Sequence, residues 1–132
     1  MRRDATGGAL ALALLAATLC LSQDEDFDAR WKEAERNREA SDGKEYEDAF
    51  AKEFGAHYAT SLTECAKETG EQPTEGFDLL LKVGARGTVE DALVRPATKF
   101  SVCFKGLTKQ MTFGVPPSPG YWVLAAVRFK RQ

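Results

Sequence analysis

The sequence predicts an α+β domain in which a small antiparallel three-stranded sheet packs against two helices. Three observations lead to this class. Apolar side chains recur every three or four residues over 44–69, apolar and polar side chains alternate over 77–83, and an aromatic and β-branched run occupies 121–129. Helical spacing beside strand-like alternation, with turn residues between them, is typical of a mixed fold with one core.

The first 22 residues are expected to form a leader and not part of the fold. Arg2 and Arg3 precede an uncharged run from Ala9 to Leu21, which is the pattern of a secretory signal peptide. The run is about 13 residues, shorter than the roughly 20 that cross a bilayer as a helix. We therefore expect cleavage after residue 22 and a periplasmic or secreted protein, with membrane contact only through the leader if it stays uncleaved.

Charge is unevenly distributed along the chain. Residues 24–48 hold 11 acids and 5 bases, whereas residues 95–132 hold 7 bases and no acid. Either the acidic segment lies near the basic end of its own domain, which we favour, or the basic end meets an anionic partner. The bases are not interleaved with aromatic residues, so nucleic acid is not an expected partner.

Two cysteines remain after the leader is removed. Cys65 and Cys103 form an even pair in an oxidising compartment, which predicts a disulfide. The bond would close a loop of about 38 residues and contribute on the order of 4 kcal/mol. The chain has no C-x-x-C motif and a single histidine, so neither a metal site nor a cofactor is predicted.

The N-terminal half predicts two helical segments. Residues 23–43 are expected to be a charged segment in which Phe27, Trp31 and Ala34 fall at helical spacing. After the break at "SDGK", Asp42 with Glu45 resembles a capping box that opens a helix over 44–69, and Gly70 supplies its stop. The buried stripe of this helix consists of Tyr46, Phe50, Phe54, Tyr58, Leu62 and Cys65.

A hairpin is predicted next. The run 77–83 reads as a strand with one buried face, built from Phe77, Leu79, Leu81 and Val83. Gly84 and Gly87 permit the positive φ of a short turn, and a second strand covers 89–94 until Pro96 ends the pairing.

The last third predicts a helix and a closing strand. Thr98 is expected to cap a helix that ends at Gly114, and "VPPSPG" at 115–120 is a rigid connection to the strand 121–129. The apolar face of this helix consists of Phe100, Cys103, Phe104, Leu107 and Met111.

Two blocks carry a resemblance to a known family. They are "FDLLLKVGARGTVEDALV" at 77–94 and "FSVCFKGLTKQMTFGVPPSPGYWVLAAVRF" at 100–129, which with the helix over 44–69 span about two thirds of the chain. Together they resemble the C-terminal domain of TonB-type energy transducers, in the variants with a cysteine in each helix. The resemblance implies a domain over 44–132 whose disulfide ties the helices together.

That family also implies a function. Such domains capture an extended segment of an outer-membrane receptor against a sheet edge, so main-chain hydrogen bonds give affinity and alternating side chains give selectivity. Carried onto this chain, the edge is the last strand. The partner-binding residues are then Tyr121, Trp122, Val123, Leu124, Ala125 and Val127.

The chain departs from a transducer in two ways. A transducer needs an uncleaved membrane helix and a long proline-rich tether. This chain has instead a short leader, followed by a charged segment of about 20 residues before its domain. We therefore expect a stand-alone exported relative that binds a cell-envelope protein. A homodimer through the last strand is the other use of the same edge.

Two alternatives to this function are an inhibitor or ligand-binding domain and an enzyme. A secreted inhibitor or small-ligand-binding domain would present the loop 115–120. An enzyme is not predicted, because the lone His57 has no nucleophile beside it and both mature cysteines are expected to be oxidised. Glu64 and Glu68, at helical spacing, are most simply a solvated face.

Overall fold

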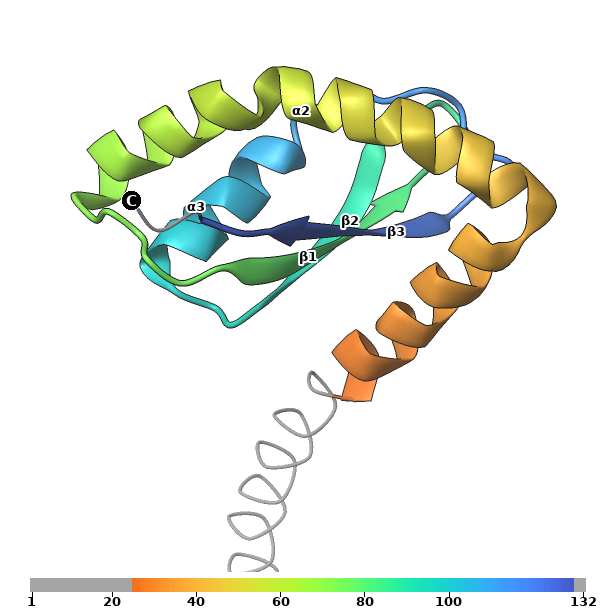
Figure 1. The fold of residues 1–132 in the computed structure, drawn as a ribbon, viewed down its shortest axis with the longest axis horizontal. Coiled ribbons are helices and arrows are strands. Elements are labelled where there is room, and N and C mark those ends of the chain that lie inside the picture. The colour runs from red at the N-terminus through yellow and green to blue at the C-terminus, as the bar shows by residue number, and fades with distance from the viewer. Residues whose placement is uncertain (1–24, 130–132) are drawn as a thin grey trace, which may run out of the picture.

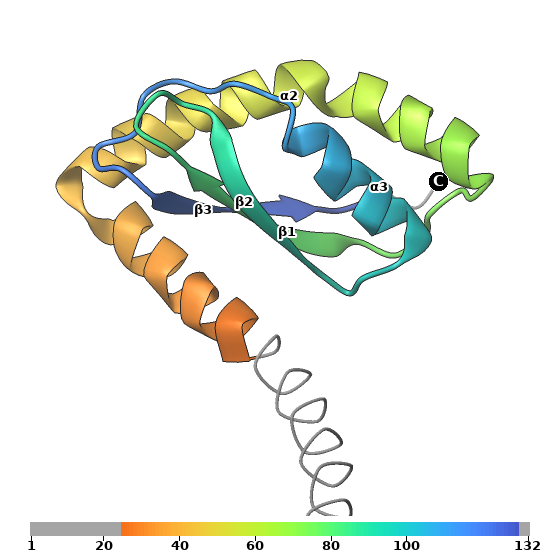
Figure 2. The same ribbon diagram turned by 180° about the vertical axis from the view of Figure 1, so that it is seen from behind.

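A computed structural model describes residues 25–129, and its fold is α+β (Figures 1 and 2). The predicted class is confirmed, while the predicted leader lies outside the described residues. Residues 25–39 are helical, and this segment is the N-terminal helix below. The other elements are α2 (Ser41–Thr69), β1 (Phe77–Val83), β2 (Val89–Arg95), α3 (Lys99–Thr108) and β3 (Tyr121–Val127). No helix within 25–129 has the length and apolar character needed to cross a membrane.

The sheet has the order β2-β1-β3, and both pairings are antiparallel. The central strand β1 is buried on both faces, because Leu79 and Leu81 point to one side and Leu80 to the other, all with no exposed surface. The prediction of a single buried face was therefore wrong. An additional layer, the N-terminal helix, covers the side that the alternation had assigned to solvent.

The first face of the sheet carries α2 and α3, and the main core lies between them and the strands (Figure 1). Aromatic rings dominate this core. Phe50 of α2 lies 4.5 Å from Phe113, and Phe77 of β1 lies 5.5 Å from Phe104 of α3, measured between ring centroids. Each buried ring contributes apolar area on the scale of 150–250 Å².

The second face is covered by the N-terminal helix. Phe27 and Ala34 pack with Leu80 and Trp122 in a separate small core, and Trp31 lies at its margin. The predicted helical stripe is confirmed. Asp28 also pairs with Arg95 at 2.8 Å, so the acidic segment does contact the basic end of its own chain.

The N-terminal helix and α2 meet at a sharp corner, which Figure 1 shows on the right. The predicted break between two helical segments is present, at Ala40, but the predicted capping box and start at residue 44 were wrong: α2 begins at Ser41, and Ala40 at its N-cap has no side-chain cap. Gly43 explains the corner. A Cβ there would overlap the carbonyl oxygen of Asn37, so only glycine lets the two helices approach so closely.

The caps at Gly70 and Thr98 follow the prediction. Gly70 ends α2 with φ 70° and donates to the carbonyl of Ala66 at 2.9 Å. At the start of α3, the Thr98 hydroxyl accepts from the Ser101 amide at 3.0 Å and the Ser101 hydroxyl accepts from the Thr98 amide at 2.8 Å. This reciprocal pair is a capping box.

The ends of α3 and β3 also differ from the prediction. The second helix stops at Thr108, six residues before Gly114, because the chain turns there so that Thr112 can bridge Thr88 beside the hairpin. Met111 therefore lies beyond α3 and packs on the core from a loop. The closing strand ends at 127 and not at 129.

One of the two predicted turn glycines has the expected conformation. Gly87 has φ 82°, whereas Gly84 is not among the positive-φ glycines of the described residues. A Cβ on Gly87 would also overlap the carbonyl oxygen of Phe113, whose amide donates to the Gly87 carbonyl at 2.8 Å. The hairpin turn is thus fixed against the segment that leads to β3.

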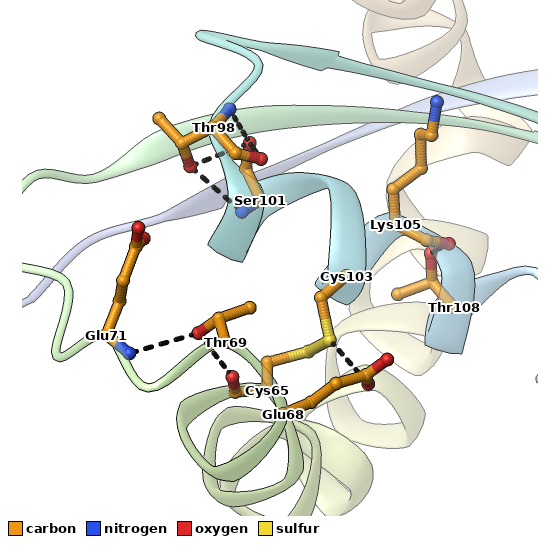
Figure 3. The surroundings of a disulfide bond; sticks show 9 residues. All are labelled: Cys65, Glu68, Thr69, Glu71, Thr98, Ser101, Cys103, Lys105 and Thr108. Atoms are coloured by element: carbon orange, nitrogen blue, oxygen red, sulfur yellow. Dashed lines mark hydrogen bonds between the residues drawn. A yellow bond between two sulfur atoms is a disulfide. The ribbon is translucent and has the colours of Figure 1, made fainter.

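The predicted disulfide is present and joins α2 to α3 (Figure 3). Cys65 is fully buried, and the Cα atoms of Cys65 and Cys103 lie 5.8 Å apart. The bridge spans 38 residues. A loop of this length corresponds to about 4 kcal/mol of chain-entropy stabilisation.

The glycine geometry yields a matched pair of stability predictions. Gly87→Ala should lower the free energy of unfolding by about 1–3 kcal/mol, because alanine is strained at this φ and clashes with Phe113. Gly106→Ala should raise it by up to about 1 kcal/mol, since that position is helical and open. Urea unfolding of the oxidised proteins measures both. Equal effects of the two substitutions would contradict this account of the turn.

Candidate interaction edge

The strand β3 is paired with β1 on one side only, so its other side is an edge of the sheet. In an antiparallel ladder the N–H and C=O of one residue point to the same side, and the side alternates along the strand. Whether the odd-numbered or the even-numbered residues of β3 face outward is the phase of this alternation, and hydrogen bonds to the strand reveal it.

Three hydrogen bonds fix that phase consistently. The Asn37 side-chain amide donates to the Trp122 carbonyl at 3.0 Å, so that carbonyl faces away from β1. On the opposite edge of the sheet the Ala92 amide donates to the Asp91 carboxylate at 2.8 Å, so this amide faces away from β1. Across the hairpin that joins β1 to β2, the Gly84 amide donates to the Thr88 carbonyl at 2.8 Å, so Gly84 faces the β2 side. Even-numbered residues of β1 thus bond to β2 and odd-numbered ones bond to β3. The outward-facing residues of β3 are Trp122, Leu124 and Ala126.

All six predicted partner-binding residues lie on β3, but they divide into two groups. Four of them point their side chains into the main core and their backbone groups toward β1: Tyr121, Val123, Ala125 and Val127. Trp122 and Leu124 have outward-facing backbone groups, with side chains in the second-face core. The prediction therefore mixed edge residues with core residues.

Ala126 lies within the predicted edge strand 121–129 but is not among the six predicted partner-binding residues. Its side chain is exposed and its backbone faces outward, so both are open to a partner. The alternation in "YWVLAAV" separates the two faces, but it does not say which residues face an edge. That information requires the pairing with β1.

The two halves of the β3 edge differ in whether their outward backbone groups already have a hydrogen-bond partner. At the Trp122 end, Asn37 occupies the carbonyl and the guanidinium of Arg30 lies 5.3 Å from the indole ring centroid. Past the other end, Arg128 folds back to Asp78 at 2.7 Å and to the Phe77 carbonyl at 3.1 Å. No hydrogen bond from the described residues reaches the outward groups of Leu124 and Ala126. We define Leu124–Ala126 as the open edge.

Helix α2 runs alongside β3 above this edge (Figure 1). Its Glu47 accepts from the Tyr121 hydroxyl at 2.9 Å, and its Tyr58 hydroxyl donates to the Arg128 carbonyl at 3.5 Å, so the two contacts bracket the strand. Between them lie the small, exposed residues Ala51 and Gly55, one helical turn apart. A Cβ on Gly55 would have no neighbour within 4 Å, which leaves room beside the helix.

The titratable groups near the edge include Glu47, whose carboxylate accepts from the Tyr121 hydroxyl of β3. Burial raises the pKa of Glu47, against the lowering effects of the Tyr121 hydrogen bond and of Arg38. Burial, with the nearby Glu53 and Glu47 carboxylates, raises the pKa of Tyr46 to about 12. Burial and the hydrogen bond to Glu47 also raise the pKa of Tyr121, so its hydroxyl stays a donor at physiological pH.

The other predicted candidates are not brought together with this edge. His57 lines a separate surface hollow with Ser61, Glu64 and Met111. Within residues 25–129, no group of three or more histidine, cysteine, aspartate or glutamate side chains could hold a metal ion.

The geometry defines a small α+β domain whose sheet edge at β3 is half open. No protein-family model, curated protein or solved structure matches this chain.

The half-buried Glu47 carboxylate gives a pH-dependent prediction. A folded-state pKa above the ordinary 4.5 means that the folded protein binds this proton more tightly, so the stability it contributes is lost as pH rises through that window. Gln at this position can still accept from Tyr121 but has no charge to desolvate. Glu47→Gln should therefore match the parent near about pH 4 and have the higher thermal midpoint near about pH 7. A difference that does not change with pH would contradict this reading.

Proposed function

We propose that this protein is an exported cell-envelope interaction module that binds an extended segment of a partner protein by strand addition at the open edge. The observation that carries the proposal is that the outward N–H and C=O groups of Leu124 and Ala126 accept or donate no hydrogen bond within residues 25–129. The resemblance to TonB C-terminal domains supports the same mode of binding. In this mode the partner's main chain supplies the affinity and its alternating side chains supply the selectivity.

The composition of β3 supports this use of the edge. Proteins normally protect an edge strand with lysine, proline, a bulge or an inward-pointing charge. The seven residues of β3, "YWVLAAV", contain no charge and no proline, and the pairing with β1 runs without a bulge. An apolar, regular and half-open edge of this kind suits a specific partner strand.

The surroundings of the edge suggest what the partner strand looks like. On the first face its side chains would meet the flank of α2 at Ala51 and Gly55, where there is room for large ones. On the second face they would lie beside Leu124 and Ala126, next to the charged N-terminal helix. Asn37 already binds the Trp122 carbonyl, so pairing is expected to be strongest at the Ala126 end.

Ala126→Pro tests the proposal most cleanly. Its N–H faces outward, so proline removes a donor for the partner and no bond to β1. Val123→Pro would instead remove a bond within the sheet. Ala126→Val is the matched control, because it adds bulk but keeps the N–H.

The measurement is affinity capture from an envelope extract of the source cell with the oxidised parent and both variants. The parent and Ala126→Val should retain the same partner, and Ala126→Pro should lose it while keeping its circular dichroism spectrum. Equal retention by all three would refute strand addition at this edge. Sedimentation velocity of the purified protein identifies the homodimer, which Ala126→Pro should convert to monomer.

A secreted inhibitor is a second candidate, favoured by the loop before β3. Val115 is 69% exposed, while the loop is fixed at its base, because Gly114 accepts from the Tyr46 hydroxyl at 3.0 Å and donates to Glu53 at 3.3 Å. The neighbouring Pro116 is buried. A rigid loop that presents an apolar side chain loses little entropy on binding.

The inhibitor reading predicts inhibition of a secreted serine protease that cleaves after valine. The parent should inhibit such an enzyme at micromolar concentration or below, and Val115→Asp should abolish the effect because it places a charge in an apolar specificity pocket. Ala126→Pro is the control that leaves the loop unchanged. Absence of inhibition by the parent across a protease panel removes this candidate.

A further inference from the structure

A second cavity lies on the side of the sheet opposite β3, and the proposed function does not use it. It has a volume of about 500 Å³ and is bounded by the N-terminal helix, the end of β2 and the first half of α3. Its walls are polar and apolar in about equal measure, and two cations but no carboxylate are among its lining residues. These are Phe27, Leu93, Val94, Arg95, Pro96, Ala97, Val102 and Lys105.

Arg95 and Lys105 are the charged residues that line this cavity. Arg95 is already engaged, since it pairs with Asp28 at 2.8 Å and stacks 4.0 Å from the Phe27 ring centroid. Lys105 forms no ion pair within residues 25–129, and Figure 3 shows its side chain extending away from the disulfide. The chain from 96 to 129 contains no acid at all. Ion pairs within residues 25–129 thus neutralise only some of the basic side chains of the segment 95–129.

The backbone of β2 is unpaired at the same place. The backbone N–H and C=O groups of Ala92 and Val94 point away from β1, because the even-numbered residues of β1 bond to Asp91, Leu93 and Arg95. The Ala92 amide is bonded to Asp91, but no hydrogen bond from the described residues reaches the N–H or the C=O of Val94. One donor and one acceptor are therefore free beside the cavity.

An apolar side chain completes the site. Val102, on the face of α3 that borders the cavity, is 46% exposed, and apart from Val115 it is the one large hydrophobic side chain exposed in the described residues. It lies one turn before Lys105 along the helix. A ligand here would meet a cation and an apolar surface side by side.

We infer that this cavity binds an acidic extended peptide segment that adds to the outer edge of β2. Its backbone pairs with Val94, a glutamate or aspartate reaches Lys105, and an apolar residue two positions along the strand covers Val102. A strand presents alternate side chains to one face, which suits this arrangement. A small free anion would satisfy the lysine but leave the Val94 carbonyl without a donor, so the geometry favours a peptide. The site is independent of the open edge on β3.

The test uses the oxidised full chain and a labelled eight-residue peptide of alternating valine and glutamate, with binding followed by fluorescence anisotropy at low salt. Lys105→Ala should weaken binding about two- to fivefold, as expected for a half-exposed ion pair. Lys109→Ala is the matched control and should leave it unchanged. The same peptide with lysine in place of glutamate should bind at least tenfold more weakly.

Backbone pairing is tested from both sides. Val94→Pro should abolish binding, whereas Val94→Thr should retain it. The peptide with N-methyl groups on the amides of one edge should also fail, and this result does not depend on whether Val94→Pro folds. Ala126→Pro should leave the affinity unchanged, which separates this site from the one on β3.

Three results would overturn the inference. Equal binding of the N-methylated peptide would show that the cavity takes the carboxylates without strand pairing. Loss of binding with Ala126→Pro but not with Val94→Pro would place the peptide on β3. No binding of the parent peptide at millimolar concentration would show that β2 has no such site.

Discussion

The rest of this structure depends on the burial of β1 on both faces and its pairing on both edges. Its leucines at 79, 80 and 81 have no exposed surface, and each of its residues bonds to β2 or to β3 in strict alternation. A register slip of one residue would exchange the two buried faces and is therefore strongly disfavoured. The central strand thus decides which backbone groups of the outer strands remain free, and both proposed strand-addition sites depend on this pairing.

The helices then determine how much of each edge is usable. On the first face, α2 follows β3 and the disulfide holds α3 beside it, so the two outer strands have separate helical neighbours. On the second face, the N-terminal helix crosses from β3 to the end of β2. It closes the β3 edge at Trp122 through Asn37, and it contributes Phe27 to the cavity at β2. One short charged helix therefore shapes both candidate sites, which gives the acidic segment a structural role in addition to its charge.

Local patterns in the sequence predict most of the elements. The stripe from Tyr46 to Cys65, the bounds of β1, and the caps at Gly70 and Thr98 depend on neighbouring residues and are read correctly. Three features depend on distant contacts and are not. The burial of Leu80 requires the N-terminal helix, the corner at Ser41 requires the close approach at Gly43, and the outward phase of β3 requires its register with β1. The sequence therefore predicts the strand of the candidate site but not its edge residues.

The central claim is that Leu124 and Ala126 have free outward amides while their neighbours bond to β1. Native-state hydrogen exchange, measured by NMR on the oxidised monomer, tests it residue by residue. The amides of Val123 and Ala125 should exchange slowly, with protection close to the global stability, and those of Leu124 and Ala126 should exchange much faster. Uniform protection along Tyr121–Val127 would contradict the open edge, and slow exchange confined to Leu124 and Ala126 would show that the phase is reversed.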